Sequence, residues 1–262
     1  NCMKTHIFTS ICKLLIFTQA ILFPAYFARL FFNDILMKDL AGIGWLWGIL
    51  GTLYALFAAF VLVAVWEHFN RLSDALSGEA RMLVSIWNYA DYLDDEKVSS
   101  SMKKSILRYI EAVTTREVAL LSKHKHVPHP SPELIEIMET IDRVEFNGPR
   151  DESAFKALIN AYDTLELKRQ IRIQESVAQV PLSLKTLFIL VSVFFVSSAI
   201  LNGFANPVLY YISTAFISMI VFSTYTVIDD LDRPYEGLWK VSYEGFTDAK
   251  EYIEKKEHGA KR

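Results

Sequence analysis

The sequence has few of the features of secreted, nucleic-acid-binding or disulfide-rich domains. Cys2 and Cys12 are its two cysteines, too few for a disulfide framework, and Cys12 stands in an apolar run as a small hydrophobic residue. The net charge is −3, and no stripe of Lys and Arg stands beside an aromatic platform. This balance weighs against a nucleic-acid partner.

The short motifs of common enzymes are also missing. The sequence has no Gly-x-Ser-x-Gly, no His-Glu-x-x-His, no P-loop and no Glu-x-x-His of the kind that di-metal bundles use. His124, His126 and His129 have a spacing that could suit a metal, but the prolines around them indicate an irregular connector. We therefore predict that the protein is not an enzyme, and we assign no catalytic residue.

The apolar residues are segregated along the chain. About half of the residues are hydrophobic, and they collect at 7–66 and 182–228, while most charges lie at 67–181 and 229–262. A soluble core would instead disperse its apolar residues among polar ones. The pattern predicts an all-α integral membrane protein with two transmembrane hairpins, 7–66 and 182–228, a helical domain at 67–181 and a tail at 229–262.

Four segments are candidate spans. No charge occurs across the 27 positions between Asp39 and Glu67, which is enough to cross a hydrocarbon layer about 30 Å thick. Segments 186–204 and 208–228 are also uncharged, and the short turn 202–207 pairs them. The first segment has only 15 uncharged residues between Lys13 and Arg29, so it either spans with both cations snorkelling or lies partly in the interface.

The distribution of Lys and Arg predicts the orientation. The turn 202–207 has neither residue and 30–42 has only Lys38, whereas the middle domain and the tail carry most of them. The positive-inside rule then places the middle domain and both termini in the cytoplasm, as a multi-pass protein of the inner (plasma) membrane of the cell. The lipid bilayer is the expected first partner.

Beyond the second span, apolar residues continue at heptad spacing, and each predicted helix has charged exceptions. The first stripe, Phe69 to Leu93, contains Glu79; the helix at 102–123 contains Glu117 on the face of Ile106, Ile110, Val113 and Leu120; and the helix at 151–180 contains Arg169 and Arg172. Buried charges need partners, and arginine pairs well with carboxylates. We predict that Glu79 and Glu117 engage Arg169 or Arg172, with a solvated edge as the alternative for Glu79.

An acidic cluster follows the fourth span. Asp229, Asp230 and Asp232 could supply oxygen ligands to calcium, although their spacing is not that of an EF-hand. The alternative is a helix end stopped by Pro234, with Asp232 and Arg233 docking the tail onto the bundle. A candidate calcium ion at these three aspartates is the one cofactor that the sequence suggests.

Several blocks of sequence resemble the bestrophin-like domain family of uncharacterised membrane proteins. The match lies in 51–56 (GTLYAL) with 65–67 (VWE), 78–80 (GEA), Arg169 and Arg172 ahead of Pro181, and 231–237 (LDRPYEG) with Val241 and Ser242. The family is similar in plan to the bestrophins, which are oligomeric ion channels gated by calcium. The resemblance implies an oligomer, with five subunits as the number that bestrophins suggest, and inorganic ions as its cargo.

The expected function is therefore an oligomeric ion channel whose pore is lined by the second span. Four spans enclose a pore poorly, so a ring of subunits is needed. Leu56, Phe60, Val63 and Glu67 share one face of the span, where a ring of Phe60 could gate by dewetting and a ring of Glu67 would favour cations. The alternative is a non-conducting sensor or scaffold whose bundle binds a protein partner.

Overall fold

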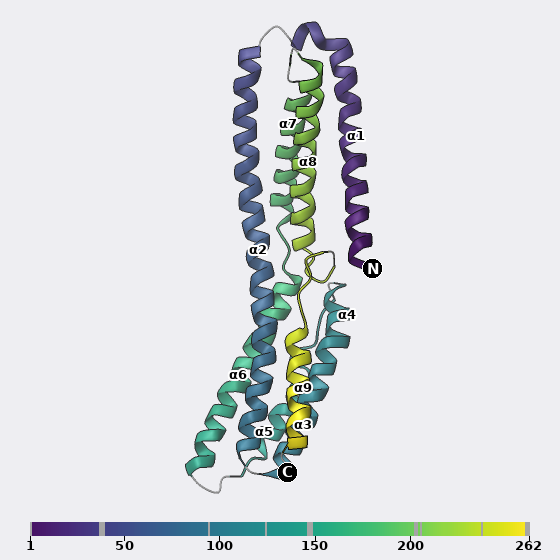
Figure 1. Ribbon diagram of the computed structural model, residues 1–262. Helices are drawn as coiled ribbons and strands as arrows, with labels where there is room; N and C mark the ends of the chain where they lie inside the picture. The colour runs from purple at the N-terminus through teal and green to yellow at the C-terminus, as the bar shows by residue number, and fades with distance from the viewer. Residues whose placement is uncertain are drawn as a thin grey trace. The chain divides into compact units, whose positions relative to one another are not determined.

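The computed structural model describes residues 2–36, 40–93, 95–123, 125–145, 149–201, 204, 206–236 and 238–259. Every element within these residues is a helix (Figure 1). The α-helices are α1 (Cys2–Leu36), α2 (Leu40–Tyr92), α3 (Glu96–Glu111), α4 (Val118–Leu121), α5 (Pro132–Asp142), α6 (Pro149–Val177), α7 (Leu182–Ile200), α8 (Pro207–Leu231) and α9 (Glu244–Gly259), and a π-helix, η1 (Ala112–Glu117), joins α3 to α4.

The chain divides into two compact units. The membrane unit comprises Asn1–Glu67, Gln179–Arg233 and Gly237–Trp239, and the bundle unit comprises His68–Ala178, Pro234–Glu236 and Lys240–Arg262. The sequence pattern placed the first boundary between 66 and 67 and treated 229–262 as a tail of its own. In the structure α9 belongs with the middle helices, because Phe246, Ala249 and Ile253 are buried in their core.

The membrane unit contains the four predicted spans, which are confirmed as helices long and apolar enough to cross a bilayer. They are Thr9–Phe32 in α1, a window within Gly44–Tyr92 in α2, Leu182–Ile200 in α7 and Pro207–Leu231 in α8. The first segment is one helix through Pro24, which favours the spanning alternative. Residues 202, 203 and 205 of the predicted turn 202–207, and Lys38 of the predicted turn 30–42, lie outside the described residues.

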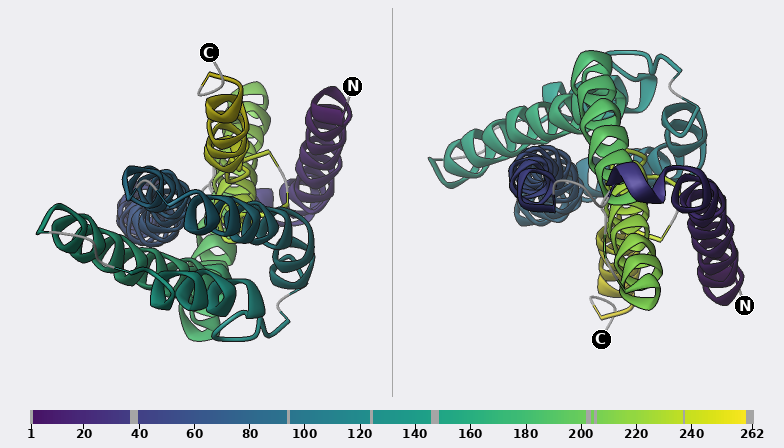
Figure 2. Two further views of the ribbon diagram at one scale, coloured as in Figure 1. Left: turned by 90° about the horizontal axis from the view of Figure 1, so that it is seen from below. Right: turned by 90° about the horizontal axis from the view of Figure 1, so that it is seen from above.

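Several polar groups of the membrane unit are hydrogen-bonded within that unit. The Tyr210 hydroxyl of α8 donates to the carbonyl of Ile200 at 2.8 Å and lies 3.0 Å from that of Ala25 in α1. Arg29 donates to the carbonyl of Phe204 at 3.1 Å, and its guanidinium lies over the Tyr210 ring. Internal satisfaction of this kind is required where no water is present. Figure 2 shows α1 beside α8 along the helix axes.

The second span packs on α7 through aromatic rings. Tyr54 stacks on Phe195 with ring centroids 5.0 Å apart and lies 6.0 Å from the Phe188 ring. One turn earlier, a Cβ at Gly51 would lie 3.3 Å from the Phe195 ring, so the absence of a side chain permits this close approach. The face of α2 with Tyr54, Ala58, Val61 and Val65 is therefore buried.

The bundle unit has one apolar core formed by helices from distant parts of the sequence. The stripe of α2 supplies Leu72, Leu76, Leu83, Ile86 and Ala90 to it, as the heptad spacing predicts. Helix α6 supplies Leu158, Tyr162 and Leu165. Burial of such stripes is the main force that holds helices of this length together.

Helix α5 follows the irregular connector that the prolines indicate, and the sequence pattern assigns no element to it. It begins where the Ser131 hydroxyl accepts a hydrogen bond from the Leu134 N–H at 3.2 Å, and Pro132 occupies the first helical position. Both are favourable at a helix N-terminus. Residues 125–131 are irregular, as the prolines indicate, and Pro132 begins a helix that the sequence pattern did not assign.

Candidate functional site

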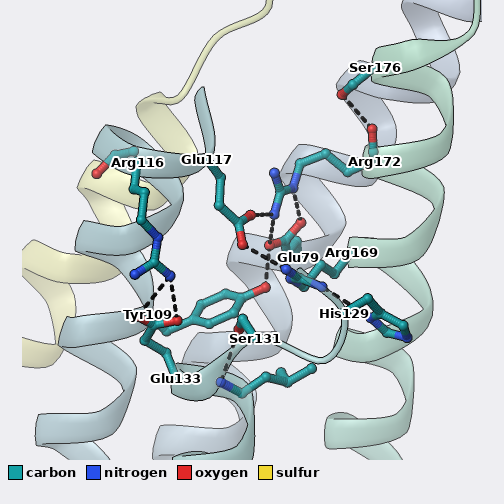
Figure 3. A network of polar contacts seen from close by, with 12 residues as sticks. Glu79, Tyr109, Arg116, Glu117, His129, Ser131, Glu133, Arg169, Arg172 and Ser176 are labelled. Carbon is teal, nitrogen blue, oxygen red and sulfur yellow. Dashed lines mark hydrogen bonds and ion pairs between the residues drawn. The ribbon is translucent and has the colours of Figure 1, made fainter. Parts of the chain in front are cut away.

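The four predicted stripe charges lie in one buried network in the bundle unit (Figure 3). The side chains of Glu79, Arg169 and Arg172 are fully buried, and that of Glu117 is 1% exposed. Arg172 binds Glu79 through Nε–Oε2 and Nη2–Oε1 separations of 2.6 and 3.1 Å. The alternative of a solvated edge for Glu79 does not hold, because no part of this side chain reaches the surface.

Glu117 connects the two arginines. Its Oε2 accepts from Arg172 Nη2 at 2.5 Å and its Oε1 accepts from Arg169 Nη2 at 2.7 Å. Two carboxylates and two guanidiniums then alternate in sign, and their formal charges cancel. Such alternation offsets much of the cost of removing four charges from water.

The π-helix η1 sets the direction of Glu117. It inserts an extra residue into the ladder, and Glu117 is its last residue. Beyond it, Leu120, which the heptad pattern places on the same face, is half-buried, and Leu121 is fully buried. π-Bulges of this kind occur frequently at functional sites.

Two further side chains complete the network, and the sequence pattern did not predict them. The Tyr109 hydroxyl donates to Glu79 Oε1 at 2.6 Å. Arg169 also donates to the carbonyl of Pro128 at 2.8 Å, and its Nη1 lies 3.1 Å from His129 Nδ1. Since arginine has no acceptor, the Nδ1 of His129 is the acceptor and carries no proton in this contact.

Burial and the neighbouring charges together set the pKa values of the network. Burial raises the pKa of the Tyr109 hydroxyl well above its usual value, and the negative charge of Glu79 raises it further. Burial alone would raise the pKa of Glu117, but the positive charges of Arg172 and Arg169 outweigh burial, so the pKa lies below its usual value. The carboxylate of Glu117 therefore stays charged around neutral pH.

The network holds elements together and has the chemistry of a structural centre. Its members come from α2, α3, η1, α6 and the connector before α5. Among the described residues, Arg169 Nε and Arg172 Nη1 find no hydrogen-bond partner, so each guanidinium retains a nitrogen whose N–H donors are unused. We assign the network no catalytic step.

The tail segment enters the bundle unit beside this network. Tyr235 hydrogen-bonds with the hydroxyl of Ser176, which itself donates to the carbonyl of Arg172 at 2.5 Å. The carbonyl of Pro234 accepts from the Val241 N–H at 3.0 Å. Tyr235 packs against the core and is thus the docking residue that the sequence pattern did not predict.

The two charged residues predicted to dock the tail have other contacts in the structure. Asp232 accepts from the Val180 N–H at 2.9 Å and forms an ion pair with Lys185, so it ties the end of α8 to the start of α7. Arg233 pairs with Asp229 one turn earlier on the exposed surface. Docking of Asp232 and Arg233 on the bundle stays a prediction.

The three aspartates do not fit a calcium site as they are placed. Asp229 binds Arg233, Asp232 binds Lys185 and Val180, and Asp230 accepts the N–H groups of Leu238 and Trp239. Their carboxylates are thus directed to three separate sets of donors. Among the residues that the structure describes, no group of three His, Cys, Asp or Glu side chains could hold a metal ion, and His124 of the predicted histidine spacing is not described.

The four predicted pore-lining residues share a face of α2 that is largely exposed among the described residues. The exposed fractions of Leu56, Phe60 and Val63 are 53%, 63% and 55%, and Glu67 is also exposed. At about 100° per residue, this face lies about 160° around the helix from the buried face of Tyr54 and Val61. This face is thus open to lipid, to a second copy or to a pore.

The fold and its centre define a class: an all-helical membrane protein with four candidate spans and a helical bundle built around a neutral network of buried charges. The model of the Bestrophin-like domain family matches residues 36–246. Since this match covers most of the chain, the protein belongs to the Bestrophin-like domain family, as the sequence resemblance predicts.

Solved structures share the fold at low sequence identity. A bacterial bestrophin homologue from Klebsiella pneumoniae with a point mutation superposes with a TM-score of 0.73 at 11% identity, over 93% of this chain and 97% of that chain. Another structure of the Klebsiella pneumoniae homologue, phased on zinc, gives 0.68 at 11% identity over 93% and 96%. No match was found among curated proteins.

Proposed function

We propose that the protein is an oligomeric ion channel in which the second span lines the pore. The observation that carries this proposal is the unburied face of α2, where three large apolar side chains and Glu67 lie in one row opposite the face that packs on α7. An exposed apolar row of this length marks an interaction surface. The bestrophin fold supports the proposal, because bestrophins are oligomeric channels.

In the proposed ring, each α2 presents the same row to a common axis. Phe60 residues from all subunits form an apolar constriction that closes the pore by dewetting, and Glu67 residues form a negative ring at one mouth that favours cations. The bundle unit and both termini lie in the cytoplasm, on the side where Lys and Arg are concentrated. The membrane is the inner (plasma) membrane, and lipid and inorganic ions are the partners.

The test is ion flux through purified protein in liposomes. Phe60→Ala should raise flux, and Glu67→Gln should shift permeability from cations towards anions. Phe216→Ala is the matched control, because Phe216 lies on the span of α8 and is 60% exposed, close to the 63% of Phe60; it should leave flux unchanged. No flux with any ion, together with a monomer by native mass spectrometry, would overturn the channel in favour of a sensor or scaffold.

A further inference from the structure

The loop after α8 carries two exposed apolar side chains at the level where the spans end. Leu238 is 45% exposed and Trp239 is 46% exposed. Both residues belong to the membrane unit, although their sequence neighbours on either side belong to the bundle unit. Apolar and aromatic side chains where a span ends suit the layer between hydrocarbon and headgroups.

Contacts within the membrane unit fix the height of this loop along the spans. The Trp239 ring meets the Trp66 ring edge-on, with centroids 5.9 Å apart and an interplanar angle of 83°. Trp66 is the last residue of the uncharged run before Glu67. Asp230, which also contacts the loop, lies where the uncharged run of α8 ends. Two independent spans therefore place Trp239 at the boundary between hydrocarbon and headgroups.

The backbone of the loop is arranged so that it can leave bulk water. The Asp230 carboxylate accepts the N–H of Leu238 at 2.9 and 3.1 Å and the N–H of Trp239 at 2.8 Å. A backbone donor moved out of water is costly unless it is already hydrogen-bonded. Asp230 thus satisfies both donors internally and holds in place the backbone that carries the two exposed side chains.

We infer that Leu238 and Trp239 form an interfacial anchor that inserts among the lipid headgroups beside Trp66. The partner is the lipid surface itself, because an indole ring has an apolar body and a polar N–H that match this layer. Asp230 is the positioning residue of the anchor. The inference does not depend on conduction, so its failure would leave the proposed channel untouched.

Tryptophan fluorescence of the full chain in phosphatidylcholine nanodiscs tests the anchor. The emission of Trp239 is obtained as the difference between the wild type and Trp239→Phe, a mild change at an exposed site. We expect this emission to be quenched by lipids that carry a nitroxide near the headgroup and to be shielded from aqueous iodide. The matched control is Trp87→Phe, which reports a residue 5% exposed in the bundle unit and should show no lipid quenching.

Two results would overturn the anchor. Quenching of Trp239 by iodide without quenching by the lipid nitroxide would place the ring in water. Shielding from both quenchers would mean that protein covers it, for instance a second copy of this chain. As a further check, Asp230→Ala should increase iodide quenching of Trp239 with the thermal midpoint of the full chain unchanged, because it releases the loop alone.

Discussion

Arg172 donates hydrogen bonds to both carboxylate oxygens of Glu79, and neither side chain reaches the surface. The two residues are 93 positions apart in sequence and come from α2 and α6, so the pair fixes the register of these two helices. If one helix slipped along the other, each charge would be buried against apolar neighbours without its partner. The pair therefore favours one arrangement of the bundle.

Removal of one partner of this pair should destabilise the protein strongly. Arg172→Met leaves Glu79 and Glu117 buried with fewer donors, and we expect a loss of about 3–5 kcal/mol in the free energy of unfolding. The measurement is urea unfolding of the full chain in detergent, followed by circular dichroism. The matched control is Arg108→Met, because Arg108 forms an exposed pair with Glu136 at 3.0 Å, and such pairs contribute less than about 1 kcal/mol.

A second substitution should restore part of this stability. In the double variant Arg172→Met with Glu79→Gln, no unpaired Glu79 charge remains. Its loss of unfolding free energy should therefore be smaller than the sum of the losses in the two single variants. Strictly additive losses would show that the two side chains do not interact in solution, whatever their distance in the structure.

The stability of the bundle should fall in acid through Glu117. Because Arg172 and Arg169 hold the pKa of Glu117 below its usual value of 4.5 despite burial, the folded state takes up this proton less readily than the unfolded state. The contribution is therefore fully present above about pH 4.5 and is lost as the pH falls through the lower folded pKa. Unfolding free energies measured from neutral pH down to this range check the direction.

The variant Glu117→Gln identifies the group responsible. It should be less stable at neutral pH, because Arg169 and Arg172 lose their shared partner, and its stability should depend less on pH in the acid range. An unchanged slope in this variant would assign the acid sensitivity to other carboxylates, such as Glu175, whose pKa is lowered from its usual value, against the effect of burial, by hydrogen bonds from Arg71 and His68.

The extra residue of η1 should be needed for the network. Deletion of the exposed Thr115 would return the segment to α-helical spacing and rotate the residues after it by about 100° relative to those before it. Glu117 or the core residues of α3 would then lose their contacts, and we expect a large fall in the thermal midpoint. Thr115→Ala is the control, because it keeps the register and removes only the hydroxyl that donates to the carbonyl of Glu111.

Polar exceptions to an apolar stripe predict the centre of this protein well. Glu79, Glu117, Arg169 and Arg172 stand out because a heptad position normally buries an apolar side chain. Tyr109 and His129 are not predictable in this way: a tyrosine suits a stripe without any polar partner, and the position of His129 depends on a connector with no periodicity. The π-helix is visible only in the structure, where it interrupts the α-helical spacing between α3 and α4.

The spans and their limits are also readable from the sequence, since lipid allows few patterns other than uncharged helices. The contacts of the acidic cluster cannot be read from the sequence. Asp232 meets Lys185 and Val180 from 47 and 52 positions away, and nothing in the local sequence distinguishes an aspartate that binds a lysine from one that binds a metal ion.

Calcium removal should have no effect on stability if the three aspartates keep these internal partners. A ligand present at 100 times its dissociation constant would stabilise the folded state by about 2.7 kcal/mol, so a calcium site would appear as a shift of the thermal midpoint between chelator and added calcium. We expect no such shift in the wild type. Lys185→Met removes the cation from buried Asp232 and should lower the midpoint, whereas Lys156→Met, which removes an exposed lysine bound to Glu152, should not. A calcium-dependent rise in the wild type that Asp230→Asn abolishes would show instead that the ion displaces the internal donors.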